Sequence, residues 1–100
     1  MIRFQRSIQV AGGKNLEAVQ WAKDVTDYLN NKQSNFKAQA FSSRFGEVNE
    51  MVWQIDFEDL AALDKYQQFF NTDQGYWEMV KKADGLFIEG TTYDSAFETL

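Results

Sequence analysis

Residues 50–63, with the sequence EMVWQIDFEDLAAL, decide the fold of this chain. Their first half alternates in polarity, and the apolar positions are Met51, Trp53, Ile55 and Phe57. An alternation with period two is typical of a strand that buries one face. Asp59 follows directly and belongs to the residue types that cap helix N-termini, so we expect a helix to begin at Leu60. The stretch therefore predicts a half-buried strand that leads at once into a helix.

Residues 2–10 predict a second half-buried strand, which Gly12 and Gly13 end. Ile2, Phe4, Ile8 and Val10 lie on one face, and Arg3, Gln5, Ser7 and Gln9 on the other. Arg6 is the one polar residue on the apolar face. We expect its side chain to reach the sheet edge and bind a carboxylate or a helix C-terminus.

A helix is predicted from an N-cap at Asn15 to about Asn31, with an apolar stripe at helical spacing. After a polar loop, residues 36–45 and 47–57 predict two strands that form a hairpin around Gly46. In the first of these strands the pattern is ambiguous. Either Phe36, Ala38 and Ala40 or Gln39, Phe41 and Ser43 could face the core.

The helix that follows Asp59 carries Leu60, Leu63, Tyr66 and Phe70 at helical spacing. Asp73 is suited to cap a shorter helix, which carries Tyr76, Trp77, Val80 and Ala83. Gly85 fits the left-handed position after a helix end. Residues 86–93 predict the last strand, and the capping-box spacing of Ser95 and Glu98 predicts a final helical turn.

The order strand, helix, strand, strand, helix, strand predicts an α+β, ferredoxin-like βαββαβ fold. Its four-stranded antiparallel sheet carries the helices on one face, and nothing in the chain is left to cover the other. This open face is rich in amides and hydroxyls, with few charges. We assign to it Arg3, Gln5, Ser7, Gln9, Glu50, Val52, Gln54, Phe87, Glu89, Thr91 and Tyr93, and also Gln39, Phe41 and Ser43 if the second strand follows. Such a mixture suits a semi-buried surface, so we expect a homodimer in which two sheets pack face to face.

Composition limits the function classes. With 100 residues, the chain has room for a single domain, 1–100. It contains neither cysteine nor histidine, which excludes disulfides, thiolate metal sites and a histidine general base. A net charge of −5 disfavours binding to nucleic acid or anionic membranes. No apolar run has the length of a membrane helix, and the first residues lack the apolar region of a signal peptide, so we expect a cytoplasmic protein without metal or cofactor.

The stretch from Val52 to Leu63, followed by Phe69-Phe70 and the segment LFIEGTT at 86–92, resembles the dimeric α/β-barrel superfamily. Within this superfamily, the chain resembles NIPSNAP-like and antibiotic-biosynthesis-monooxygenase-like small proteins. The resemblance implies a homodimer, a dimeric α/β barrel whose two sheets enclose a cavity for a small molecule. Haem-handling relatives bind iron through histidine, which is missing here. Chemistry in which an electron-rich substrate reacts directly with oxygen remains compatible with this composition.

Candidate site residues lie on the predicted open face. Arg3, facing Glu89, could bind a carboxylate or phenolate, or could simply form an ion pair with it. Glutamine side chains could orient a polar ligand or bond one another across the two-fold axis, and the hydroxyl of Tyr93 could donate a proton. The candidate cavity-lining residues are Arg3, Gln5, Gln39, Gln54, Glu89 and Tyr93.

Two functions are compatible with these features of the sequence. The first is a cofactor-independent, monooxygenase-like enzyme acting on a small aromatic metabolite, in a cavity between sheet and helices or at the dimer interface. The alternative is a non-catalytic homodimer that binds a small molecule or has a structural role. Calcium-loop, nucleotide-binding and serine-hydrolase motifs are all missing from the sequence.

Overall fold

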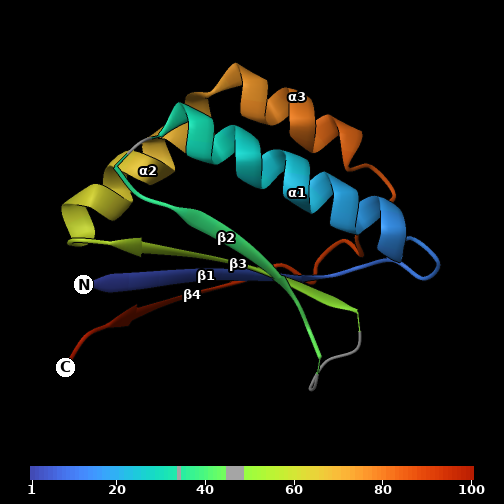
Figure 1. Ribbon diagram of the computed structural model, residues 1–100, viewed down its shortest axis with the longest axis horizontal. Coiled ribbons are helices and arrows are strands. Elements are labelled where there is room, and N and C mark those ends of the chain that lie inside the picture. Colours follow the sequence, from blue (N-terminus) through green and yellow to red (C-terminus); the bar gives the residue numbers. More distant parts are fainter. Residues whose placement is uncertain (34, 45–48) are drawn as a thin grey trace.

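Strand β1 (Ile2–Gln9) lies inside the sheet and pairs antiparallel with one strand on each side. The computed structural model describes residues 1–33, 35–44 and 49–100. The strand order is β2-β3-β1-β4, as expected for a ferredoxin-like fold (Figure 1). The other elements are α1 (Asn15–Lys32), β2 (Ala38–Ser42), β3 (Glu50–Phe57), α2 (Leu60–Thr72), α3 (Gln74–Lys82) and β4 (Tyr93–Glu98).

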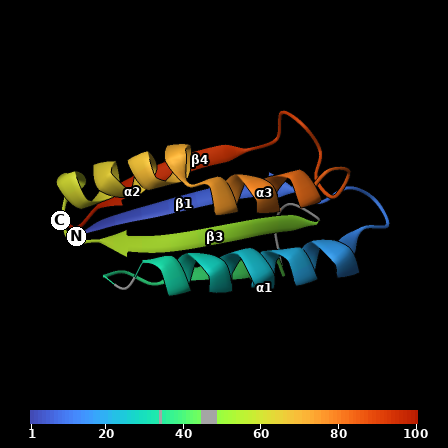
Figure 2. The ribbon, with the colours of Figure 1, turned by 90° about the horizontal axis from the view of Figure 1, so that it is seen from above.

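All three helices lie on one face of the sheet, as the sequence predicts. Figure 2 shows α1 along one side and α2 and α3 end to end along the other. The predicted α+β fold class is thereby confirmed, and β2 and β3 are antiparallel neighbours. The turn predicted around Gly46 lies outside the described residues. Among the described helices, none is both long and apolar enough to cross a membrane.

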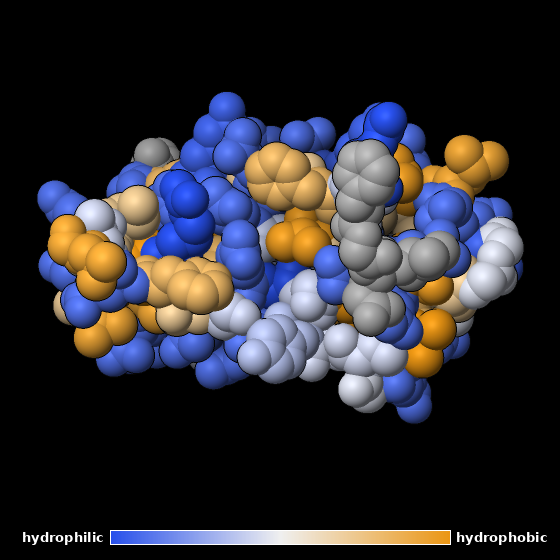
Figure 3. All heavy atoms as spheres, turned by 90° about the horizontal axis from the view of Figure 1, so that it is seen from below, coloured by the Kyte–Doolittle hydropathy of each residue, from blue (hydrophilic) through white to orange (hydrophobic). Residues whose placement is uncertain are grey.

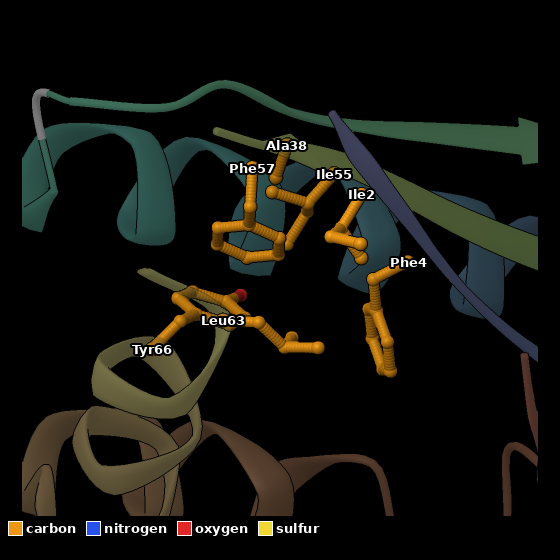
Figure 4. Close-up of a cluster of buried hydrophobic side chains, with 7 residues drawn as sticks. All are labelled: Ile2, Phe4, Ala38, Ile55, Phe57, Leu63 and Tyr66. Atoms are coloured by element: carbon orange, nitrogen blue, oxygen red, sulfur yellow. The ribbon is translucent and has the colours of Figure 1, made fainter. Parts of the chain in front are cut away.

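The register explains which residues form the core. Phe4 is opposite Ile55, and Ile2 is opposite Phe57, so the apolar faces of β1 and β3 coincide. Ala38 is opposite Ile55, which resolves the ambiguity in β2: Ala38 faces the helices. Figure 4 shows these side chains facing Leu63 and Tyr66 of α2. Each large apolar side chain buried in this way contributes about 1.5–3 kcal/mol to the stability of the fold.

The helix starts were predicted with unequal success. Asp59 caps α2, since its carboxylate accepts a hydrogen bond from the Ala62 amide at 2.9 Å. The prediction of Asn15 as a cap was wrong by one residue. Lys14 holds the cap position without a side-chain bond, and Asn15 instead donates to the side chain of Asn49 at 3.3 Å.

The predicted last strand, 86–93, was also wrong. Within residues 86–92, only Phe87 forms a bridge, to Val10, because Gly85 and Gly90 adopt positive φ values of 80° and 81° and bend the chain. The paired strand is instead β4, in the segment predicted to form a final helical turn. It begins at Tyr93, pairs only with β1 and is exposed along most of its length. Without a buried face it has no period-two hydrophobic pattern.

The break between α2 and α3 is tied to α1 by one hydrogen bond. The Tyr28 hydroxyl donates to the Asp73 carboxylate at 2.5 Å, and Asp73 also accepts from the Tyr76 amide at 2.9 Å as the cap of α3. The bond to Tyr28 lowers the pKa of Asp73, so the carboxylate stays ionised as a cap. Gly75 leaves the space that the Tyr28 hydroxyl occupies, since a Cβ at this position would collide with it.

We therefore expect Gly75→Ala to destabilise the protein, although alanine is the better helix former. The new methyl group displaces the Tyr28 hydroxyl and breaks its bond to Asp73. Thermal unfolding followed by circular dichroism should show a midpoint lower by about 4–8 °C. Gly12→Ala is the matched control, because nothing lies within 4 Å of its added Cβ. Equal midpoints for the two variants would contradict this role of Gly75.

Candidate functional site

A cavity of about 300 Å³ lies between the sheet and the helices. This volume is at the lower end of the range for small-molecule sites. Every helix and the two central strands contribute to its wall. The lining residues are Phe4, Arg6, Ile8, Trp21, Val25, Leu29, Trp53, Ile55, Tyr66, Phe70, Tyr76, Trp77, Val80, Ala83, Phe87 and Thr92.

Half of the lining residues are aromatic, and two of them, Trp21 and Trp53, are fixed by their own hydrogen bonds. The Trp21 indole N–H donates to the Met79 carbonyl at 2.8 Å, and that of Trp53 donates to the Thr26 hydroxyl at 3.2 Å. The two rings meet edge to face, with centroids 6.0 Å apart. Phe87 adds a second edge-to-face contact to Trp21 at 5.5 Å. These rings form a rigid apolar surface against which a flat molecule can pack.

Arg6 is the one charged side chain among the described lining residues. Its Nε and Nη2 donate to the two oxygens of Asp94 at 2.7 and 2.8 Å, in a bidentate ion pair. The guanidinium also lies 5.8 Å from the centroid of the Phe4 ring and 5.7 Å from that of Phe70. The expectation that Arg6 binds a carboxylate at the sheet edge is confirmed, since Asp94 belongs to the edge strand β4.

Tyr66 is the second polar group of the cavity wall. The residue is only 2% exposed, and its hydroxyl has no hydrogen-bond partner within the part of the chain that the structure describes. Burial raises the pKa of Tyr66, so the hydroxyl keeps its proton and stays a donor. Burial likewise raises the pKa of Tyr76, and the positive charge of Arg6 acts in the opposite direction. A buried hydroxyl without a hydrogen-bond partner lowers the stability of the fold. A ligand in the cavity could accept the hydrogen bond that the Tyr66 hydroxyl does not make within the described protein.

A second cavity, of about 330 Å³, adjoins the first and shares part of its wall. The shared residues are Phe4, Arg6, Tyr66, Phe70, Tyr76 and Trp77. Gln67 and Asn71 of α2 make the second cavity more polar. Arg6 and Tyr66 therefore lie where an apolar chamber meets a polar one.

Most of the candidate site residues lie on the opposite side of the sheet from this cavity. Arg3 forms a bidentate ion pair with Asp56, at 2.9 and 3.1 Å. This pair lowers the pKa of Asp56. Gln5 donates to the Gln54 side chain at 3.2 Å. Gln39 on β2 lies opposite Gln54, so the row of amides continues onto this strand. Gln39 and Phe41 therefore lie on the open face of the sheet and not in the core.

Glu89 does not join this group. It lies exposed in a turn outside the sheet, and Arg3 is bound to Asp56 instead, so the predicted juxtaposition of Arg3 and Glu89 was wrong. The cause is the misplaced last strand, which assigned residues 86–92 to the sheet. Phe87, also assigned to the open face, instead packs against Trp21 in the cavity wall. Tyr93 does face the open side, opposite Ser7 at the start of β4, and is 69% exposed.

The described residues bring no three acidic side chains together in a group that could hold a metal ion. The polar groups of the cavity are thus hydrogen-bond donors and hydroxyls: Arg6, Tyr66, Tyr76 and Thr92. The sequence pattern singled out Arg6 as a polar residue on an apolar face but gave it no part in the site. Tyr66 and Tyr76 were assigned to helix stripes, where a lining tyrosine and a core tyrosine have the same spacing.

We expect Tyr66→Phe to leave the fold intact and to raise the free energy of unfolding by up to about 1 kcal/mol, because it removes a buried, unpaired hydroxyl. Tyr28→Phe is the matched control. It removes a hydroxyl that is bonded to Asp73 and should lower the stability. Urea unfolding of both variants measures the difference, and a clear loss of stability in Tyr66→Phe would show that the hydroxyl has a partner in the protein.

No protein-family model matches the chain, and no curated protein is similar to it in sequence. Solved structures are similar in fold. A NIPSNAP domain protein from Burkholderia xenovorans superposes with a TM-score of 0.81 at 12% identity, over 100% of this chain and 95% of the other. A NIPSNAP family protein from Agrobacterium tumefaciens gives 0.80 at 13% identity, over 99% and 92%.

An antibiotic biosynthesis monooxygenase gives a TM-score of 0.71 at 10% identity, over 100% of this chain and 99% of the other. The resemblance inferred from residues 52–63 and 86–92 is thus matched by the solved structures at the level of the fold. The chain has the ferredoxin-like α+β fold that is found in NIPSNAP family proteins and in an antibiotic biosynthesis monooxygenase.

Proposed function

We propose that this protein is a cytoplasmic homodimeric enzyme that oxidises a small aromatic metabolite with molecular oxygen, without a cofactor, in the cavity between sheet and helices. The observation that carries the proposal is the cavity itself: about 300 Å³, with aromatic rings as half of its lining residues and with Arg6 and Tyr66 as donors. A flat ring fits such a wall through edge-to-face and stacking contacts. The donors then fix its orientation.

The type of reaction is suggested by the fold. One structural neighbour is an antibiotic biosynthesis monooxygenase, and the resemblance seen in the sequence points the same way. An electron-rich substrate can supply all the electrons itself. One hydrogen atom leaves the ring carbon that is oxidised and one leaves a ring hydroxyl group, and both depart with one oxygen atom as water. The second oxygen atom becomes a carbonyl oxygen on that carbon, and the hydroxyl oxygen becomes a second carbonyl oxygen. The protein then has to bind the ring, hold its oxygen substituents and keep bulk water out.

Oxygen uptake tests this proposal. With a panel of hydroxynaphthalenes and hydroxyanthracenes, we expect at least one compound to consume one molecule of oxygen per molecule of product. Val80→Trp should abolish the uptake, because Val80 lines the cavity from α3 and the larger side chain fills the space. Lys23→Trp, on the exposed outer side of α1, is the control and should retain full activity. Uptake that survives in Val80→Trp would place the reaction elsewhere.

A specific observation favours the second candidate, a non-catalytic binding protein. Among the described lining residues there is no carboxylate, and the chain has no histidine or cysteine, so the cavity lacks a general base. A binding protein should retain aromatic compounds with no oxygen uptake from any of them. Calorimetric titration of the same panel beside the oxygen measurement separates the two functions.

For the homodimer, the support comes from the open face. Phe41, Tyr93 and Phe97 are among the exposed large apolar side chains and project from this face, at 46%, 69% and 56% exposure. Figure 3 shows this side of the molecule, with hydrophobic side chains interspersed among hydrophilic ones. The ion pair of Arg3 with Asp56 and the paired amides leave this face nearly neutral. We propose that Arg3, Gln5, Gln39, Gln54 and Tyr93 lie between two such sheets, in an interface near the standard size of roughly 800 Å² per partner.

Val52→Arg should therefore convert the dimer to monomer, because Val52 lies on β3 in the row with Ser7 and Phe41. A second copy would then bury the added charge without a partner in a desolvated interface. Leu16→Arg introduces the same charged side chain on α1, where Leu16 is 85% exposed, and should leave the dimer intact. Native mass spectrometry at micromolar concentration reports both, and a wild-type monomer would overturn the dimer proposal.

A further inference from the structure

We propose that Arg6 and Tyr66 together bind an uncharged carbonyl oxygen of the aromatic ligand, so that the cavity selects neutral aromatic carbonyl compounds. This inference rests on the proposed binding function of the cavity and not on the oxidation step. It concerns the chemical class of molecule that accepts hydrogen bonds from Arg6 and Tyr66, which line both the apolar and the polar cavity.

The guanidinium of Arg6 is held in a fixed position, but not all of its N–H groups donate hydrogen bonds to Asp94. A guanidinium has five N–H donors, and Asp94 accepts from Nε and Nη2. The N–H groups that Asp94 does not use are left as donors for a ligand. Because Asp94 and the rings of Phe4 and Phe70 fix the group from several sides, its remaining donors have a defined direction. Little side-chain entropy is then lost when a ligand binds.

Tyr66 supplies the second donor from the opposite layer of the molecule. Its ring extends from α2 toward the sheet, as Figure 4 shows, and both cavities include it in their walls. The hydroxyl is buried without a partner among the described residues. An O–H and an N–H at the same boundary are complementary to an atom that only accepts, such as a carbonyl oxygen with its two lone pairs.

Charge decides between a neutral and an anionic acceptor. Arg6 is the one charged group in the described wall, and Asp94 already balances it. A carboxylate on the ligand would add a net negative charge between apolar rings and beside Asp94. That charge would lose its hydration without gaining an unpaired cation. A neutral carbonyl gains the same two hydrogen bonds without this cost.

Three probes of matched shape test the inference by isothermal titration calorimetry: 2-acetylnaphthalene, 2-isopropenylnaphthalene and 2-naphthoate. The first two differ only in a carbonyl oxygen against a methylene group. We expect the ketone to bind at least about tenfold more tightly than the alkene, as one or two hydrogen bonds to buried donors would give, and more tightly than the carboxylate. Tyr66→Phe should remove most of the preference for the ketone while the affinity for the alkene stays the same.

The double variant Arg6→Met with Asp94→Asn removes both charges together, which avoids leaving one of them buried alone, and should also reduce the preference. Equal affinity of wild-type protein for ketone and alkene would overturn this inference but leave the cavity as a binding site. Tighter binding of 2-naphthoate would overturn it in favour of an anion site. If none of the three probes binds, the proposed binding function itself fails.

Discussion

The pairing of β1 on both of its edges is the constraint on which the remaining structure depends. Both β3 and β4 are paired with β1 in a fixed register. The side of the sheet on which a β1 side chain lies is therefore also the side of the residues opposite it on β3 and β4. Phe4 and Ile55 are paired and both face the helices, whereas Gln5 and Gln54 are paired and both face the open side. A shift of one residue would exchange the two sets and expose the core. The separation into an apolar, helix-covered side and a polar, uncovered side follows from this register.

The elements that the sequence predicted well are those with a buried face. In β1 and β3, water exclusion on one side produces an alternation that can be recognised without a structure, and Asp59 and Asp73 mark helix starts by their own chemistry. The edge strand β4 has no such pattern because the helices leave it exposed, so its pairing with β1 depends on backbone bonds rather than on hydrophobic burial. The hydrophobic residues at 86–88, which predicted a strand, have a different role. Phe87 packs on Trp21 in the cavity wall.

The candidate site was predictable only in part, for a related reason. Arg6 could be recognised because a charge on an apolar face is an exception that needs a partner, and Asp94 is that partner. Tyr66 could not be recognised, since a tyrosine on an apolar helix stripe is usually a core residue. What distinguishes it is an unpaired hydroxyl, which depends on the placement of surrounding elements.

The two faces of the sheet meet in β4, which has a role in both proposals. Its odd-numbered residues Tyr93, Ser95 and Phe97 point to the open side, while Asp94 points to the helix side and holds Arg6. An edge strand paired on one side only is the least constrained part of a sheet. A second copy resting on Tyr93 and Phe97 would restrict β4, and with it the carboxylate that positions Arg6 at the cavity. Dimerisation and ligand recognition would then be coupled through adjacent residues of β4, since Tyr93 faces the partner and Asp94 holds Arg6.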